Sequence, residues 1–154
     1  MPGPDARDAA EFGPARDGDL DALVSIDRGS PQAWTRDAFA VELPHVPPTL
    51  FVLRSSGVPV AFVVTRFLVP DMDIVNLAVA TDRRGRGLGR LLLASLLDHA
   101  ASNRVQSVFL EVREGNQEAR RLYRSAGFEE TQRRSGFYRE PLEDAILMRL
   151  AMSH

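Results

Sequence analysis

The segment Arg84-Gly85-Arg86-Gly87-Leu88-Gly89-Arg90 decides how this chain folds. It follows a run rich in β-branched residues, Met72–Val79, and precedes a leucine-rich stretch, Leu91–Ala101, whose apolar spacing predicts a helix. Three glycines at alternate positions allow positive φ angles and a close approach of the backbone to a ligand. Successive N–H groups in such a turn, together with the N-terminus of the following helix, favour an anion such as a phosphate or pyrophosphate.

Two better-known phosphate loops do not fit this segment. A Walker loop needs the sequence Gly-Lys-Ser/Thr, and the chain contains no lysine. A Rossmann fingerprint has the spacing Gly-x-Gly-x-x-Gly after the first strand of a parallel unit, whereas here Gly-x-Gly-x-Gly follows strands predicted to be antiparallel. The remaining structural alternative is a tight strand-to-helix turn whose arginines are only solvated.

The composition predicts one folded domain. The chain has 154 residues and a mass of 17.0 kDa, and 44% of its residues are hydrophobic, which suits a single domain with its own core. Residues 1–9, rich in Pro, Gly and Asp, are expected to form a disordered tail and residues 10–154 the domain. No stretch reaches the ~20 apolar residues of a membrane span, and the start lacks the parts of a signal peptide. We therefore expect a cytoplasmic protein without membrane contact.

Missing residue types restrict the chemistry. The sequence contains no cysteine, so a thiol nucleophile and a zinc–thiolate site are excluded. All 19 basic residues are arginine, which excludes a Schiff-base lysine. The three histidines, His45, His99 and His154, lie far apart, and no metal site is expected from them. Carboxylates, tyrosines, hydroxyls, arginines and backbone amides remain to carry out any reaction.

Charge is distributed unevenly along the chain. Residues 1–76 hold six arginines and eleven acidic residues, a net charge of −5, whereas residues 77–154 hold thirteen and ten, a net charge of +3. This asymmetry indicates an anionic ligand for the second half, although an arginine-rich solvated surface would give the same count. A nucleic-acid partner is not expected, because the whole chain has a formal charge of −2 and only two tyrosines and one tryptophan for base stacking.

Hydrophobic periodicity predicts an α/β (α+β) fold of about seven strands and about four helices. The strands are expected at residues 11–15, 50–54, 58–67, 72–79, 105–113, 128–133 and 145–152, and those between 50 and 79 should form an antiparallel meander. The helices are expected at residues 20–26, 35–43, 91–101 and 116–126, with Thr35 and Asn116 as N-caps and Gly127 after the last one.

Two residues in the second half are candidates for proton transfer. Glu111 is a charged residue near the end of the otherwise apolar strand 105–113. It can act as a general base, or it can pair with Arg113 or another arginine. Tyr123 completes the apolar stripe of helix 116–126. Its ring can pack in a core while its hydroxyl reaches a cleft, so a structural and a catalytic role are both open.

Two motifs, in this order, resemble those of the GNAT superfamily of N-acetyltransferases. Arg84-x-x-Gly87-x-Gly89 is similar to the Arg/Gln-x-x-Gly-x-Gly/Ala signature of the loop that binds the pyrophosphate of acetyl-CoA in that superfamily. Asn116-x-x-Ala119-x-x-Leu122-Tyr123-x-x-x-Gly127-Phe128 resembles its other motif. The resemblance implies the GNAT fold, a central mixed, mostly antiparallel sheet with a V-shaped splay between strands 72–79 and 105–113. It also implies acetyl-CoA as cosubstrate, with no metal.

The resemblance implies roles for single residues as well. Glu111 would be the general base, directly or through water, and Tyr123 the general acid that protonates the sulfur of CoA. Without a cysteine, the acetyl group would pass directly to the acceptor in a ternary complex. The residues implied to bind the cosubstrate are Leu77, Ala78, Val79, Arg84, Gly85, Arg86, Gly87, Leu88, Gly89, Arg90 and Asn116.

Five segments resemble one branch of the superfamily, the RimI-type ribosomal-protein alanine N-acetyltransferases. They are Pro31-x-x-Trp34-Thr35, Asn76–Val79, Leu110–Arg113, the motif around Tyr123 and Glu143–Met148. The resemblance implies a protein N-terminus as acceptor, the N-terminal alanine of small-subunit ribosomal protein 18.

The segment Gln132–Pro141 departs from the pattern of that branch, which has paired tyrosines followed by proline. This chain has Phe137-Tyr138 after an inserted glycine. Because this loop helps to shape the acceptor site in the branch, a small amine or another protein N-terminus stays open as the acceptor. A non-catalytic CoA-binding module is disfavoured by the joint presence of Glu111 and Tyr123.

Overall fold

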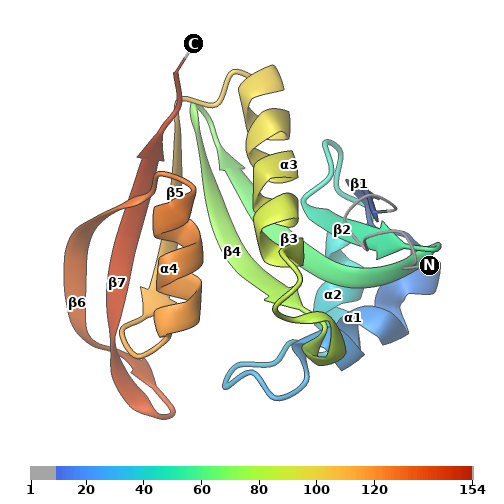
Figure 1. Cartoon of the computed structure of the whole chain (residues 1–154), viewed down its shortest axis with the longest axis horizontal. Helices are drawn as coiled ribbons and strands as arrows, with labels where there is room; N and C mark the ends of the chain where they lie inside the picture. Colours follow the sequence, from blue (N-terminus) through green and yellow to red (C-terminus); the bar gives the residue numbers. More distant parts are fainter. Residues whose placement is uncertain (1–9, 154) are drawn as a thin grey trace, which may run out of the picture. The chain divides into compact units, whose positions relative to one another are not determined.

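The computed structural model describes residues 10–153, and the expected tail, residues 1–9, lies outside the described residues. Within residues 10–153 the chain forms seven strands, four α-helices and two short 3-10 helices (Figure 1). The strands pair in the order β1-β2-β3-β4-β5-β7-β6. The pairing of β4 with β5 is parallel, and the other described pairings are antiparallel. The predicted mixed, mostly antiparallel sheet is confirmed.

The expected elements are all present, with small differences at their ends. The strands are β1 (Ala10–Pro14), β2 (Leu50–Ser55), β3 (Val58–Leu68), β4 (Asp71–Val79), β5 (Ser107–Arg113), β6 (Glu129–Arg139) and β7 (Leu142–Ala151). The α-helices are α1 (Leu20–Asp27), α2 (Arg36–Glu42), α3 (Leu88–Ser102) and α4 (Gln117–Ser125), and the 3-10 helices are η1 (Asp17–Asp19) and η2 (Thr81–Arg83).

The end of β6 was predicted wrongly. The sequence indicated a strand that stops at Arg133, but β6 continues to Arg139. The register of β6 against β7 shifts between Arg134 and Tyr138, and Gly136 within the shift has a φ of 61°. A bulge with a glycine in the left-handed region lets a strand continue through residues that read as a loop.

The chain divides into two compact units. Of the described residues, the first unit contains 10–64 together with Asn76–Ser95, and the second contains Thr65–Val75 and residues 96–153. The expectation that residues 10–154 form one domain stays a prediction.

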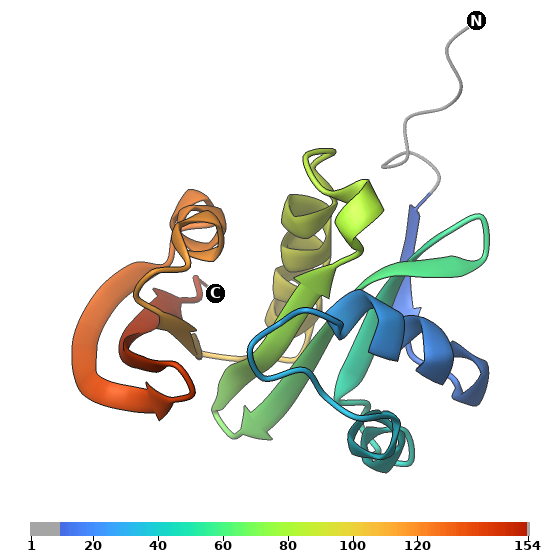
Figure 2. The ribbon, with the colours of Figure 1, turned by 90° about the horizontal axis from the view of Figure 1, so that it is seen from below.

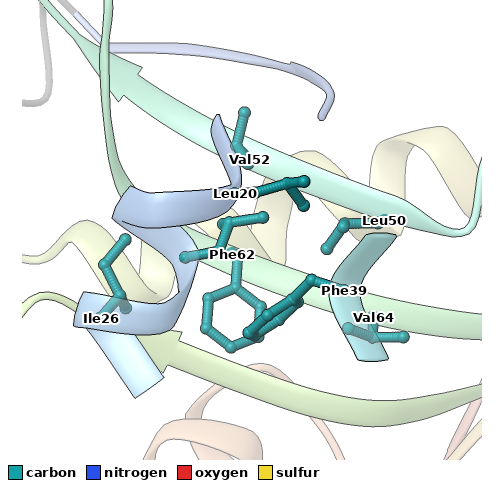
Figure 3. Close-up of a cluster of buried hydrophobic side chains, with 8 residues drawn as sticks. Leu20, Ile26, Phe39, Leu50, Val52, Phe62 and Val64 are labelled. Atoms are coloured by element: carbon teal, nitrogen blue, oxygen red, sulfur yellow. The ribbon is translucent and has the colours of Figure 1, made fainter. Parts of the chain in front are cut away.

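The first unit is built around an apolar cluster beneath two short helices. Figure 2 shows α1 and α2 on one side of β2 and β3 and the first turns of α3 on the other. Alternate residues of a strand point to opposite faces, so one set from β2 and β3 meets the two helices. The cluster consists of Leu20, Leu23, Ile26, Phe39, Leu50, Val52, Phe62 and Val64, all at most 6% exposed (Figure 3).

The second unit is centred on β5. Its ladder with β4 is parallel and runs from Asp71 opposite Ser107 to Ile74 opposite Leu110. Its other edge pairs with β7 along its whole length. α4 lies over β5 and β7 (Figure 1), and its Tyr123 ring packs edge-on against Phe128. The splay predicted between β4 and β5 would begin after Ile74 and Leu110, where the described ladder ends, and it stays a prediction.

Candidate active site

The glycine turn lies in the first unit, at the start of α3. Gly85 and Gly87 have φ angles of 77° and 78°, which glycine adopts far more readily than other residues. Gly89 does not share this conformation, because it lies inside α3. The N–H of Leu91 donates to the carbonyl of Gly87 at 3.1 Å, so the N–H groups of the preceding helical residues have no partner within the helix. The turn therefore offers backbone donors to an anion.

Exposed arginines surround this turn. Arg84, Arg86 and Arg90 are all exposed, and each adds positive charge near the start of the helix, where the helix dipole also favours an anion. Arg84 has a further contact, because its Nε donates to the carbonyl of Val79 at 3.4 Å. This contact brings together the turn and the end of β4, two of the segments predicted to bind the cosubstrate. Leu77, Ala78 and Val79 are partly buried there.

Glu111, Asn116 and Tyr123 belong to the second unit, so the structure places the predicted residues in two groups. Glu111 lies on the exposed face of β5, while Leu110 and Val112 on the other face are buried, as predicted. Its Oε1 atom is 3.4 Å from Nη1 of Arg134, and the side chain is 33% exposed. Glu111 thus combines an ion pair with access to solvent.

Tyr123 lies at the buried face of α4. It is only 6% exposed. Burial, with a smaller contribution from Tyr138, raises the pKa of the Tyr123 phenol. Because this phenol keeps its proton at neutral pH, it can donate one to a strongly basic group.

Tyr138, on β6, was not among the predicted catalytic or cosubstrate-binding residues. Burial and then the charge of Glu111 raise the pKa of its phenol, while Arg113 opposes them. The guanidinium of Arg113 lies 4.2 Å from the centre of the Tyr138 ring and also pairs with Glu143 at 3.3 Å. Tyr138 is therefore within electrostatic range of both predicted catalytic residues. The aromatic pair Phe137-Tyr138 was the only sequence signal for it.

Asn116 is the N-cap of α4, as predicted. Its side-chain oxygen accepts a hydrogen bond from the N–H of Ala119 at 3.1 Å. This bond satisfies one of the unpaired donors at the start of the helix. Its predicted contact with the cosubstrate stays a prediction.

Among residues 10–153, His, Cys, Asp and Glu side chains form no group of three or more that could hold a metal ion. None of the helices described in this range has the length and hydropathy of a membrane span.

The fold and these two groups define an enzyme class. A donor-rich glycine turn suits a phosphorylated cosubstrate, and an accessible carboxylate and a buried phenol both suit proton transfer. The model of the acetyltransferase (GNAT) family matches residues 20–128. The chain therefore belongs to the GNAT acetyltransferase family, and it is an N-acetyltransferase that takes its acetyl group from acetyl-CoA.

Individual relatives agree with this assignment. The [ribosomal protein bS18]-alanine N-acetyltransferase of Escherichia coli K12 is 38% identical over 105 residues, which cover 67% of this chain and 71% of that protein. The enzyme of the same name from Salmonella typhimurium is 34% identical over 135 residues, which cover 80% and 91%. The crystal structure of the E. coli ribosomal-protein-S18-alanine N-acetyltransferase superposes with a TM-score of 0.85 at 32% identity, covering 94% of this chain and 95% of that one.

Proposed function

We propose that this enzyme acetylates the α-amino group of a protein N-terminus and that its acceptor is the N-terminal alanine of ribosomal protein bS18. The similarity to the E. coli and Salmonella enzymes, whose names state this acceptor, supports the proposal. The single observation that carries it is the 32% identity to the E. coli enzyme across 94% of this chain. An acceptor of this kind would place the enzyme in the cytoplasm.

Glu111 is proposed as the general base. A free α-amino group has a pKa of ~7.7–8.0, so at neutral pH most of it is an ammonium that cannot attack a carbonyl carbon. A carboxylate on an accessible strand face can accept that proton directly or through a water molecule. The side chain of Glu111 is 33% exposed, so an acceptor amine or a water molecule can reach its carboxylate.

Tyr123 is proposed as the general acid. The acetyl thioester of the cosubstrate supplies an activated carbonyl and leaves behind a thiolate. The Tyr123 phenol is protonated at neutral pH, so it can supply a proton to that sulfur. Since the chain has no cysteine to carry the acetyl group, the acceptor amine attacks the thioester directly, with both substrates bound.

The first unit is proposed to bind the cosubstrate. The N–H groups at the start of α3, with Arg84, Arg86 and Arg90, suit the pyrophosphate. The backbone of Leu77–Val79 is proposed to hydrogen-bond the pantetheine arm, and an N–H group there can polarise the thioester oxygen. Asn116 is proposed to make a further contact.

A peptide acetylation assay tests the acceptor. The enzyme is incubated with acetyl-CoA and a short peptide that carries the N-terminal sequence of bS18, and the mass increase of the peptide is followed. Matched peptides start with another residue, or carry a blocked N-terminus, and spermidine represents the small amines. We expect the bS18 peptide to react fastest and the blocked peptide not at all. Equal rates on every unblocked amine would remove bS18 as the acceptor but keep the acetyltransferase.

A further inference from the structure

Asp27 is a buried carboxylate at the end of α1. The residue is 1% exposed. Its Oδ2 atom accepts a hydrogen bond from the backbone N–H of Trp34 at 2.7 Å and another from Nδ2 of Asn76 at 3.3 Å. Its Oδ1 atom is buried without a hydrogen-bond partner. Burial raises the pKa of this carboxyl, and the two hydrogen bonds oppose that shift.

Such a carboxylate is costly for the fold. Burying a charged or polar oxygen without a full set of partners is unfavourable, and an apolar side chain of similar size would avoid that cost. Each of the two hydrogen bonds that Asp27 accepts fixes another segment of the first unit.

The first bond closes a loop. Residues 28–33, between α1 and α2, are all exposed, and the bond to the N–H of Trp34 ties the end of this connection back to its start. The Trp34 ring is itself anchored, because it lies 5.4 Å from the Phe39 ring, which in turn packs edge-on against Phe62 at 5.1 Å. The loop base is thus fixed to the core of the first unit.

The second bond reaches β4 at the residue before Leu77. Successive residues of a strand alternate in direction but share one backbone, so holding the side chain of Asn76 limits the movement of the backbone that follows. The next three residues, Leu77–Val79, are those proposed to hydrogen-bond the cosubstrate. At their far end, Arg84 holds the carbonyl of Val79. The segment is therefore held on both sides.

We infer that Asp27 is a positioning residue that fixes the cosubstrate-binding end of β4 through its hydrogen bond with Asn76. The inference rests on the proposed role of Leu77–Val79. Asp27 acts without touching the cosubstrate: it sets the backbone geometry of a binding segment from the buried end of α1.

The test measures CoA binding by calorimetry in the wild type and in three variants. Asn76→Ala removes only the strand bond and leaves the loop bond intact, and we expect it to raise the Kd for CoA about three- to tenfold, the loss of one hydrogen bond. Asp27→Ala removes both bonds and should weaken binding at least as much. Asp27→Asn keeps a side-chain oxygen that can accept both bonds, so its Kd should stay within about twofold of the wild type. Asp21→Asn, the same change at an exposed position of α1, is the control.

A second readout needs no ligand. Amide hydrogen exchange in the segment 76–80 should be faster in Asn76→Ala than in the wild type, because the backbone there opens more often. If Asp27→Ala does not fold, Asn76→Ala and Asp27→Asn still test the positioning role of Asp27.

The outcomes separate this inference from the proposed function. The positioning role alone would be overturned if the wild type binds CoA and Asn76→Ala shows the same Kd for CoA and the same amide exchange as the wild type. A wild type that does not bind CoA would overturn the proposed role of Leu77–Val79, and the inference with it. Weakened binding in Asn76→Ala, together with near wild-type binding in Asp27→Asn, would support it.

Discussion

Nη1 of Arg134 on β6 lies 3.4 Å from Oε1 of Glu111 on β5, although β7 separates the two strands in the sheet. The Arg134 side chain therefore reaches across β7 to the proposed base. The two side chains are 48% and 33% exposed, so solvent screens the pair and it stabilises the fold little. A cationic acceptor that approaches Glu111 meets a carboxylate that already has a cation beside it.

Arg134→Gln should improve the binding of the acceptor. Removing the guanidinium takes away its repulsion of the acceptor ammonium, so the KM for an acceptor peptide should fall about two- to fivefold, in line with a partly exposed charge pair. The Kd for CoA should not change. Arg133→Gln is the matched control, because Arg133 is the neighbouring arginine of β6 and pairs with Glu114 instead. A rise in the peptide KM would show that Arg134 binds the acceptor rather than competing with it.

Glu111→Gln should lower activity in a pH-dependent manner. At pH 7 the acceptor needs a base, and we expect kcat/KM to fall about 100-fold. At pH 9 most α-amino groups, with a pKa of ~7.7–8.0, are already neutral, so the loss should be smaller. Glu114→Gln is the control, since Glu114 also pairs with a β6 arginine, Arg133, at 2.6 Å. A pH profile parallel to that of the wild type would contradict the role of Glu111 as a base.

Tyr123→Phe should lower turnover and leave CoA binding nearly intact. The change removes only the hydroxyl and keeps the ring that packs against Phe128. Loss of a general acid should cost at least about 100-fold in kcat. Tyr138→Phe, which removes the other phenol in this unit, should lower kcat less. A greater loss in Tyr138→Phe would reassign the acid to Tyr138, and a large loss of CoA affinity in Tyr123→Phe would mean that this residue is mainly structural.

Most of the fold could be predicted from the sequence, because the buried faces of strands and helices carry apolar residues at a regular spacing. The alternation of Val108, Leu110 and Val112 with Phe109 and Glu111 indicated β5, and the three- and four-residue spacing around Tyr123 indicated α4. Residues 134–139 of β6 were not predicted as strand, because Ser135-Gly136 reads as a turn. Whether such a glycine ends a strand or forms a bulge depends on pairing with β7, which no local pattern reports.

The candidate site residues could be chosen only in part from local sequence patterns. Glu111 stands out as a charged residue in an apolar strand, whereas Tyr123 completes the apolar stripe of its helix and was chosen from the resemblance to the GNAT motif. The partner of Glu111 could not be chosen, since Arg134 is 23 positions away in the numbering and reaches it only through the register of the bulged β6. Asp27 gave no signal, because a single aspartate at the end of a helix reads as a solvated residue until its burial is known.

Gly87→Ala should weaken acetyl-CoA binding. Gly87 has a φ of 78°, and holding an alanine there costs enough that the turn should move, raising the Kd for acetyl-CoA about tenfold. The KM for the acceptor should be unchanged. Gly13→Ala is the control, because a Cβ at Gly13 meets nothing within 4 Å and its φ lies outside the left-handed region. Unchanged acetyl-CoA binding in Gly87→Ala would remove the turn from the proposed cosubstrate site.

Asp19→Asn should destabilise the enzyme more at neutral than at acidic pH. Both carboxylate oxygens of Asp19 accept hydrogen bonds from Arg54 at 2.6 Å in a buried pair, and these bonds hold the pKa of Asp19 below the ordinary value for an aspartate, 3.8. A lowered carboxyl pKa stabilises the fold above the unfolded-state value, and that stability is lost as the pH falls through the folded-state value. Urea unfolding at pH 7 should therefore show a loss of about 3 kcal/mol in Asp19→Asn, and a smaller difference from wild type below pH 3.8. The exposed Asp21→Asn should change little at either pH. If Asp19→Asn lost the same unfolding free energy at neutral and at acidic pH, the ionised form of Asp19 would contribute nothing to stability.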